Sequence, residues 1–523
     1  MQSPTRRTLV GALIAVPLLG AAACSGSGSE GGDQGGKSLV VDTSFDLKTS
    51  DPARSFEFTG TLLDKSLYQT ALQFDNGRTP KPVPELASYT MSDHNKVLTL
   101  KMRKGATFSD GSPVTADDVV FSYQRVQGIK GNPSFLLDGV TVKKVDDSTI
   151  TLTSEQPNPQ LPAILPNPSL GIVNADVVKK HGGTTDAKDK ADTFLDGTSA
   201  GSGPYMLESY DPASRVVLKA NPHWGGDKPA YSRVVVRNVA AATQKVNIES
   251  GDSQLAMDLS PDQIASLDTS RVNHTTAPST DTIYLFLNQN PSVNTFTSDP
   301  DFVAGVKQAI DYDAVVKQAG KGAERLAGVV PTVFLGALPQ SQGITSDPAA
   351  ARQKIKASGY RGESIPFYFP NDMTVGGVPL QPIAEKVQAQ LKKVGVTITL
   401  KPGPSATAID AYRAGKDAMG MWYWGSDYPD PSDYLVFTPE ENVGVRAQWK
   451  KGSSPQVDAL VRQAKAAVSP EDRDRAYQAL QVGLNKYGPF IPLFAPASNV
   501  VTATSVKSVV LNPASTFAFA DVK

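Results

Sequence analysis

Residues 365–400, with the sequence IPFYFPNDMTVGGVPLQPIAEKVQAQLKKVGVTITL, indicate the fold class of this chain. Residues 365–369 are apolar and aromatic, which is typical of a strand. Apolar side chains then recur at the spacing of one helix face, and Gly395 marks the end of that helix. This face consists of Ile383, Val387, Leu391 and Val394. Residues 396–400 again favour a strand, so the stretch predicts a β-α-β unit and an α/β fold with parallel strands.

Two further helix starts agree with this class. Thr115 and Asp118 form a capping-box pattern, in which each side chain satisfies a free backbone N–H group at the start of a helix within residues 112–126. Ser469 followed by Pro470 predicts another helix, because serine is a good N-cap and proline fits the first helical position. We interpret these residues as structural.

Length and composition limit the possible functions. A chain of 523 residues exceeds what one hydrophobic core usually serves, so we expect two or three domains or one multi-lobed unit. Hydrophobic residues make up 40% and charged residues 20%, which excludes wholesale disorder. There are 51 basic and 52 acidic residues, so the chain has no basic excess to neutralise phosphates. We therefore expect no nucleic-acid partner.

The N-terminus has the pattern of an export signal. Arg6 and Arg7 supply a positive region, residues 9–19 a short apolar region, and three alanines precede a cleavage point. We expect residues 1–23 to be removed as a signal peptide, by either the general or the twin-arginine route. No later stretch approaches about 18 uninterrupted apolar residues, the length of a spanning helix.

The single cysteine, Cys24, follows this signal directly. A bacterial lipoprotein signal places its lipidated cysteine at this position, although Ala21 stands where such signals usually have leucine. We expect Cys24 to be lipidated and residues 24–37 to form a flexible Gly/Ser tether. The alternative is an incidental cysteine in an ordinary signal peptide. A lone cysteine excludes intrachain disulfides and cysteine-pair metal or redox sites.

Two nucleotide-binding patterns occur within the tether. The dinucleotide pattern is Gly26-x-Gly28-x-x-Gly31, and the P-loop pattern runs from Gly31 to Ser38. Both patterns need a strand before the glycines and a helix after them, because the helix N-terminus holds the phosphate. Here a tether precedes them and residues 39–41 favour a strand. We interpret both patterns as chance matches.

Several blocks in a fixed order resemble the extracellular solute-binding proteins, family 5, which feed peptide, nickel and some oligosaccharide ABC importers. The most specific block joins PELA at 84–87, LTLKMRKG at 98–105 and FSDGSPVTADDV at 108–119. The others are DPA at 51–53, GSGPY at 201–205, NPHWGG at 221–226 and WGSDYPDP at 424–431. The resemblance extends from about Leu39 to the end of the chain.

This resemblance implies a periplasmic-binding-protein-like α/β fold with two lobes, hinge strands between them and an inserted subdomain. Ligand would bind in the cleft, and the lobes would close on it. The first lobe is expected to comprise residues 38–62, 196–275 and 492–523. The inserted subdomain is expected at 63–195 and the second lobe at 276–491.

The resemblance also implies a ligand-binding site. In peptide-binding members the aspartate of a W-x-x-D segment pairs with the peptide α-ammonium, and Trp424 and Asp427 match that spacing. Gly425 lies between them, and Met421 is close by in sequence. Under the alternative interpretation, Asp427 and its neighbours Asp430 and Asp433 only shape a turn and face solvent. The spacing of these three carboxylates does not match a calcium loop.

Three further residues are candidates for ligand contact. Phe56 and Phe58 occupy the loop after the DPA block, where peptide-binding members line the cleft with backbone groups. The two phenylalanines could equally stack on sugars or pack under a loop. Arg446 is a candidate partner for a ligand carboxylate, with a solvated surface arginine as the alternative.

Enzyme signatures are absent from the sequence, which contains no G-x-S-x-G and no H-E-x-x-H motif. The histidines are isolated, so we expect surface or packing roles for them and no metal site or cofactor. They are His94, His181, His223 and His274. The few histidines also argue mildly against a nickel ligand.

We therefore expect a monomeric lipoprotein on the extracytoplasmic face of the cell membrane. It would capture oligopeptides or dipeptides and pass them to ABC permease subunits. The alternatives are an oligosaccharide receptor of the same fold, a chelated-nickel binder, a secreted enzyme and a structural cell-envelope protein.

Overall fold

The computed structural model describes residues 37–523. The expected signal peptide at 1–23, the expected lipidation site Cys24 and the tether up to residue 36 lie outside the described residues, as do all the glycines of the two nucleotide patterns. Within residues 37–523, no helix is both long enough and apolar enough to cross a membrane.

The first sheet has seven strands in the order β12-β21-β11-β1-β10-β9-β8. They are β1 (Ser38–Thr43), β8 (Tyr205–Asp211), β9 (Arg215–Ala220), β10 (Arg233–Asn238), β11 (Leu255–Ala256), β12 (Val272–Pro278) and β21 (Ala497–Ala503). The strand expected at 39–41 is confirmed as part of β1, which pairs in parallel with β10 and β11. Three helices accompany this sheet in sequence: α1 (Phe58–Leu67), α6 (Ala241–Ser250) and α7 (Pro261–Ala265).

The second sheet has six strands in the order β14-β20-β13-β19-β15-β18. They are β13 (Thr282–Leu287), β14 (Glu324–Arg325), β15 (Ile365–Pro370), β18 (Ile398–Gly403), β19 (Met419–Trp424) and β20 (Phe490–Ala495). The helices of this part are α8 (Pro300–Ala309), α9 (Tyr312–Gln318), α10 (Pro348–Ala357), α11 (Leu380–Lys393), α12 (Ser405–Arg413), α13 (Asn442–Arg446), α14 (Pro455–Ala466) and α15 (Pro470–Tyr487). A short hairpin adds β16 (Thr374–Val375) and β17 (Val378–Pro379).

The β-α-β unit predicted within residues 365–400 is confirmed. β15 and β18 pair in parallel from Ile365 opposite Ile398, and α11 connects them. Gly395 follows the helix with φ of +88°, a left-handed conformation that glycine adopts without steric cost. Ser469 caps α15 through the Asp472 N–H, as its sequence signal predicted.

The central strand β13 shows why this sheet is stable. All six of its residues are buried, and successive side chains point to opposite faces. Ile283, Leu285 and Leu287 belong to one hydrophobic core, whereas Tyr284 and Phe286 belong to the core on the other face. Helices must therefore cover both faces, which is the layered arrangement of an α/β fold.

The expectation of parallel strands holds only in part, because both large sheets are mixed. β13 pairs antiparallel with β19 and β20, and β9 pairs antiparallel with β8 and β10. Short hairpin connections such as that between β8 and β9 produce antiparallel neighbours, and local hydrophobic patterns do not reveal strand direction.

A third, antiparallel sheet has the order β4-β5-β7-β6. Its strands are β4 (Ala87–Ser92), β5 (Val97–Met102), β6 (Val140–Asp146) and β7 (Thr149–Ser154). Nearby are β2 (Leu72–Phe74), β3 (Pro82–Pro84), α2 (Ala116–Ile129), α3 (Leu161–Ile164), α4 (Ala175–Lys180) and α5 (Asp192–Leu195). The predicted capping box is confirmed at α2, where Thr115 and Asp118 each accept a bond from the other's backbone N–H.

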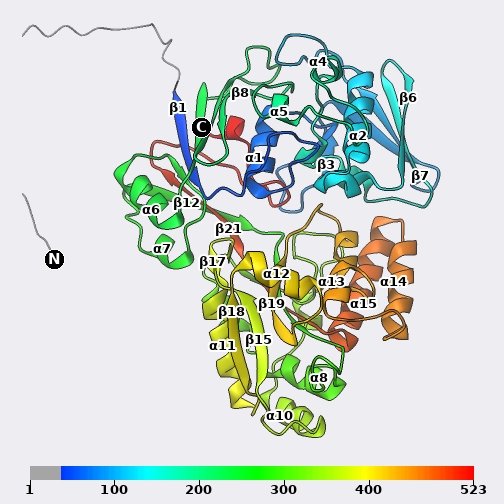
Figure 1. The fold of residues 1–523 in the computed structure, drawn as a ribbon, viewed down its shortest axis with the longest axis vertical. Helices are drawn as coiled ribbons and strands as arrows, with labels where there is room; N and C mark the ends of the chain where they lie inside the picture. The colour runs from blue at the N-terminus through cyan, green and yellow to red at the C-terminus, as the bar shows by residue number, and fades with distance from the viewer. Residues whose placement is uncertain (1–36) are drawn as a thin grey trace, which may run out of the picture. The chain divides into compact units, whose positions relative to one another are not determined.

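Two connections lead between the large sheets. β12 ends at Pro278 and β13 begins at Thr282, while β20 ends at Ala495 and β21 begins at Ala497. Figure 1 shows the red β21 between the blue and green elements of the first sheet and the yellow and orange elements of the second. The fold has two α/β lobes, hinge strands and an inserted subdomain. The expected residue boundaries of these three parts stay a prediction.

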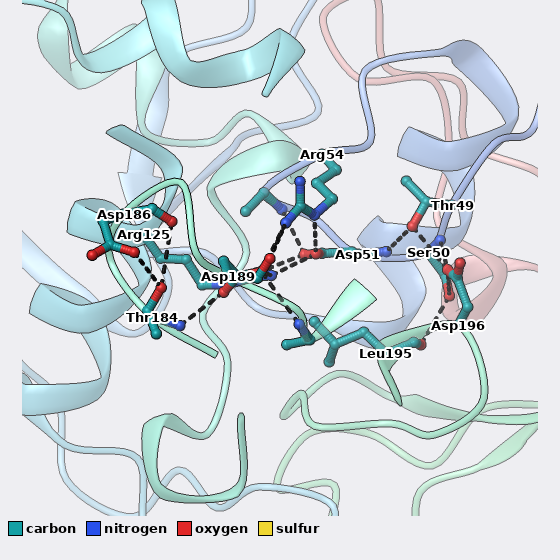
Figure 2. Close-up of polar contacts among 12 residues, drawn as sticks. Thr49, Ser50, Asp51, Arg54, Arg125, Thr184, Asp186, Asp189, Leu195 and Asp196 are labelled. Carbon is teal, nitrogen blue, oxygen red and sulfur yellow. Dashed lines mark hydrogen bonds and ion pairs between the residues drawn. The ribbon is translucent and has the colours of Figure 1, made fainter. Parts of the chain in front are cut away.

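A buried ion-pair network fixes the segment between β1 and α1 (Figure 2). Arg125 of α2 is 1% exposed, and its guanidinium donates two bonds of 2.6 Å to Asp51. It donates two more, of 2.8 and 2.9 Å, to Asp189. Arg54 adds a bond of 2.8 Å to Asp189. The two guanidinium groups and two carboxylates balance in charge, so each buried ion has a partner.

The pKa of Asp189 shows the strength of this network. Burial alone would raise this pKa, but the hydrogen bonds and charge of Arg125 outweigh burial and lower the pKa to about 2. The DPA block at 51–53 therefore has a structural role in this chain. The Asp51 carbonyl also accepts bonds from the N–H groups of Arg54 and Ser55, which shapes the turn before α1.

Candidate ligand-binding site

A cavity of about 530 Å³ lies between residues 135–164 and residues 424–465. Six lining residues come from the first segment: Phe135, Leu136, Asp138, Asn158, Gln160 and Ile164. Ten come from the second, and among them are Trp424, Asp427, Tyr428 and Asp433. Small-molecule sites typically measure about 300–1,000 Å³, so this cavity suits a small solute.

The segment after β19 builds the most polar wall of this cavity. β19 ends at Trp424, and the chain then turns into a 3-10 helix that spans Pro431–Phe437. Asp430 caps this helix by accepting a 2.9 Å bond from the Ser432 N–H, and it forms an ion pair with Arg473. This cap holds Asp433 in the first turn of the helix, facing back toward the end of β19.

Asp433 holds Trp424 and Asp427 in place. Its Oδ2 atom accepts a 3.0 Å bond from the Trp424 indole N–H and a 3.2 Å bond from the Asp427 backbone N–H. Asp433 is 4% exposed and Asp430 is 8% exposed. The interpretation that these two carboxylates face solvent is therefore wrong: one forms an ion pair, and the other is buried beneath the predicted ligand-binding residues.

The Asp427 and Asp433 carboxyl groups interact with each other. Burial raises the pKa of Asp427 to about 6, although a hydrogen bond with the Asp433 side chain lowers it in part. Burial, and then the charge of Asp427, raise the pKa of Asp433 well above its ordinary value. Among residues 37–523, neither carboxylate has an ion-pair partner. A half-buried carboxylate beside a buried one, neither of them paired with a cation, favours the binding of a positively charged group.

Arg446 lies behind the cavity wall. It is 9% exposed, so the alternative of a solvated surface arginine is wrong. Its guanidinium donates a 2.8 Å bond to Asn442 Oδ1 and lies 5.4 Å from the ring centre of Tyr412 and 5.9 Å from that of Trp424. Asn442 and Trp424 line the cavity, whereas Arg446 does not. Arg446 therefore supports two lining side chains from behind.

The opposite wall contacts the same loop. Asn167 Nδ2 donates a 3.0 Å bond to the Asp427 backbone carbonyl, and Tyr428 packs against the hydrophobic core that contains α2 and the four-stranded sheet. Phe135 is 40% exposed at the cavity and meets Phe56 edge to face at 5.5 Å between ring centres. Residues far apart in sequence thus enclose the cavity from both sides.

The remaining predicted site residues lie outside the cavity lining. Met421 has no exposed surface and belongs to the core of the second sheet, so we leave it out of the proposed site. Gly425 is half-buried, and Phe56 supports Phe135 from behind. Phe58 is 46% exposed, and it begins α1, whereas the sequence predicted a loop there. Neither of the two phenylalanines considered for sugar stacking lines the cavity, whereas Trp424 does.

Sequence reasoning missed several residues of the site. Glu441 and Lys465 line the cavity as an ion pair of 3.0 Å, although 24 positions separate them in the chain. Asn442 also lines it, and its amide is oriented by Arg446. The sequence carried no local signal for these contacts, because they depend on how α13 and α14 pack. Asp433 did have a signal, since it lies six residues after Asp427 in the same acidic turn.

The histidines have separate environments. His181 stacks on Phe194 at 3.7 Å between ring centres, and His274 Nε2 lies 2.8 Å from Asn499 Oδ1. Among the residues that the structure describes, no group of three or more His, Cys, Asp or Glu side chains could hold a metal ion.

Comparison with known families decides the classification. The family model described as bacterial extracellular solute-binding proteins, family 5 (middle), matches residues 81–442, which is more than half of the chain and includes Asp427 and Asp433. The chain belongs to this family. Family 5 members are extracytoplasmic solute-binding proteins of ABC transporters, so their role is binding and delivery of a solute.

Similar proteins agree with this assignment. The probable D,D-dipeptide-binding periplasmic protein DdpA of Escherichia coli (strain K12) is 28% identical over 487 residues, covering 91% of this chain and 92% of DdpA. The glutathione-binding protein GsiB of Salmonella choleraesuis (strain SC-B67) is 26% identical over 477 residues, covering 87% and 88%. The Helicobacter pylori periplasmic binding protein DppA, solved with the peptide STSA, shares the fold with a TM-score of 0.76 at 21% identity, covering 93% of this chain and 98% of DppA.

Proposed function

We propose that this family 5 protein captures short peptides in the 530 Å³ cavity and delivers them to an ABC permease. The main supporting observation is the half-buried Asp427 carboxylate, which lines the cavity beside Asp433 and has no ion-pair partner within residues 37–523. The α-ammonium of a peptide would supply that partner. The relatives named for dipeptide and glutathione binding support a peptide as the solute.

The wall around Asp427 suits a peptide N-terminus. Trp424 presents its indole, fixed by Asp433 on its N–H and by Arg446 against its ring. Asn442 accepts from Arg446 through Oδ1, which leaves its amide N–H groups available to a peptide carbonyl oxygen. A short peptide fits the cavity volume better than a long one, because the volume lies in the lower half of the range of about 300–1,000 Å³ for small-ligand sites.

The deciding experiment compares Asp427→Asn with the unaltered protein. Both are refolded to remove co-purified ligand, and binding of Ala-Ala and Ala-Ala-Ala is measured by calorimetry. We expect Asp427→Asn to weaken binding at least about 100-fold, because loss of one partner of a buried ion pair costs about 3–5 kcal/mol. N-acetylated peptides should bind neither protein measurably.

The matched control is Asp410→Asn, which makes the same chemical change on the exposed surface of α12. It should bind peptides like the unaltered protein. Unchanged peptide affinity in Asp427→Asn would show that the α-ammonium binds elsewhere.

We also propose that Cys24 is lipidated and anchors the protein to the membrane. The proposal rests on the sequence, because Cys24 lies outside the described residues. In the native host, the full-length protein should fractionate with membranes, and Cys24→Ser should shift it to the soluble extracytoplasmic fraction. Membrane association of Cys24→Ser equal to that of the unaltered protein would exclude this anchor.

A further inference from the structure

The charged side chains that line the cavity are mainly acidic. Asp138, Asp427, Asp433 and Glu441 face a single cationic lining residue, Lys465. Lys465 already pairs with Glu441 at 3.0 Å, so these two charges offset each other. The other three carboxylates have no ion-pair partner among residues 37–523. One peptide α-ammonium would therefore leave the cavity with an excess of negative charge.

The excess is concentrated at Asp427 and Asp433. Asp433 is 4% exposed, lines the cavity and directs one oxygen to the Trp424 and Asp427 N–H groups. Both carboxyl-bearing residues line the cavity, and the 3.2 Å bond from the Asp427 N–H to Asp433 Oδ2 keeps the two residues adjacent. Two neighbouring carboxylates disfavour double ionisation unless a cation lies near each of them. A ligand with two neighbouring positive charges would stabilise both ionised carboxylates.

We infer, on the basis of the proposed function, that the preferred peptides begin with a residue whose side chain is also positively charged. Asp427 would bind the α-ammonium and Asp433 the side-chain cation of the same residue. Peptides with an N-terminal lysine, ornithine or 2,4-diaminobutyrate residue have this chemistry. Both charges then come from one residue, which matches the adjacency of the two carboxyl groups.

One competing arrangement uses the same residues. Asp427 and Asp433 could share one proton, so that the pair carries a single negative charge and one α-ammonium satisfies it. Neutral and basic first residues would then bind equally well. The two arrangements therefore predict different affinities for two peptides whose first side chains have the same size but differ in charge.

The experiment measures binding of Lys-Ala and norleucine-Ala at pH 7, because norleucine has the aliphatic chain of lysine without its charge. Ornithine-Ala and diaminobutyrate-Ala complete the series, and Ala-Lys places the same charge on the second residue. We expect the best basic-first dipeptide to bind about 10- to 100-fold tighter than norleucine-Ala, the range that corresponds to one charge-assisted hydrogen bond. Ala-Lys should show no such preference.

The deciding variant is Asp433→Asn. Its side-chain oxygen can still accept from Trp424 and Asp427, so the wall keeps its geometry. Within Asp433→Asn, we expect the ratio of the Kd of norleucine-Ala to the Kd of the best basic-first dipeptide to fall to about two or less. A thermal melt of each variant without ligand checks that the fold is intact.

The outcomes separate this inference from the proposed function. Failure of these dipeptides and of Ala-Ala-Ala to bind would overturn the proposed function itself. Equal binding of Lys-Ala and norleucine-Ala would be consistent with peptide capture. It would refute the binding of a second cation by Asp433 and favour a proton shared between Asp427 and Asp433. A preference that persists in Asp433→Asn but disappears in Asp138→Asn would place the second charge at Asp138, and it would refute the role of Asp433.

Discussion

At the residue scale, the raised pKa of Asp427 predicts pH-dependent peptide binding. Burial raises this pKa to about 6, and an α-ammonium pairs only with the ionised carboxylate. As pH falls below 6, the protonated form accumulates, and affinity should decrease up to tenfold per pH unit. The peptide amine, with a pKa of about 8, stays charged in this range.

We therefore expect Ala-Ala to bind about tenfold more weakly at pH 5 than at pH 7, which calorimetry would show as a tenfold larger Kd. The already weak binding to Asp427→Asn should change far less over this interval. The stability of the ligand-free protein should depend on pH in the opposite sense and increase as pH falls. A carboxyl group whose folded pKa is raised stabilises the fold while protonated, and this stability is lost as pH rises from about 4 to 6. A Kd that is constant from pH 7 to pH 5 would contradict the role of Asp427.

At the element scale, the sequence predicted features that depend on neighbouring residues better than features that depend on long-range contacts. The caps at Thr115 and Ser469 and the glycine at the end of α11 act within a few residues, so sequence spacing predicted them. Strand direction was predicted only in part, because pairing joins distant segments. For the same reason, the sequence did not reveal the bonds from Arg125 to Asp189 or the burial of Arg446. The W-x-x-D segment pointed to Trp424 and Asp427 because the resemblance to a family carried that information, whereas hydrophobic patterns did not.

At the scale of the whole body of residues 37–523, bonds between the part before residue 278 and the part at 282–495 predict closure on the ligand. Asn167 Nδ2 binds the Asp427 carbonyl at 3.0 Å, and Arg78 pairs with Glu324 at 2.8 Å. These bonds join residues that only the crossings at 278–282 and 495–497 connect covalently within the fold. Peptide binding should therefore favour a more compact form, because a bound ligand shifts the balance toward the state it contacts from both sides.

We expect Ala-Ala to reduce the radius of gyration in X-ray scattering. Asn167→Asp should weaken peptide binding about five- to tenfold, because it removes the Nδ2 donor yet keeps the oxygen that caps residues 168–170. Arg78→Ala, at an exposed pair, should have a smaller effect. A radius of gyration that is the same with and without peptide would argue against closure.

The network around Arg125 limits how this protein can be recombined with its relatives. Asp51 and Arg54 belong to the segment before α1, whereas Arg125 and Asp189 belong to the part expected at 63–195. A chimera that exchanged only 63–195 would separate the two halves of this buried charge set. An uncompensated buried ion costs about 3–5 kcal/mol, which is a large fraction of the stability of a typical domain. Transfer of ligand specificity by exchange of this part would therefore require residues 49–54 to be exchanged with it.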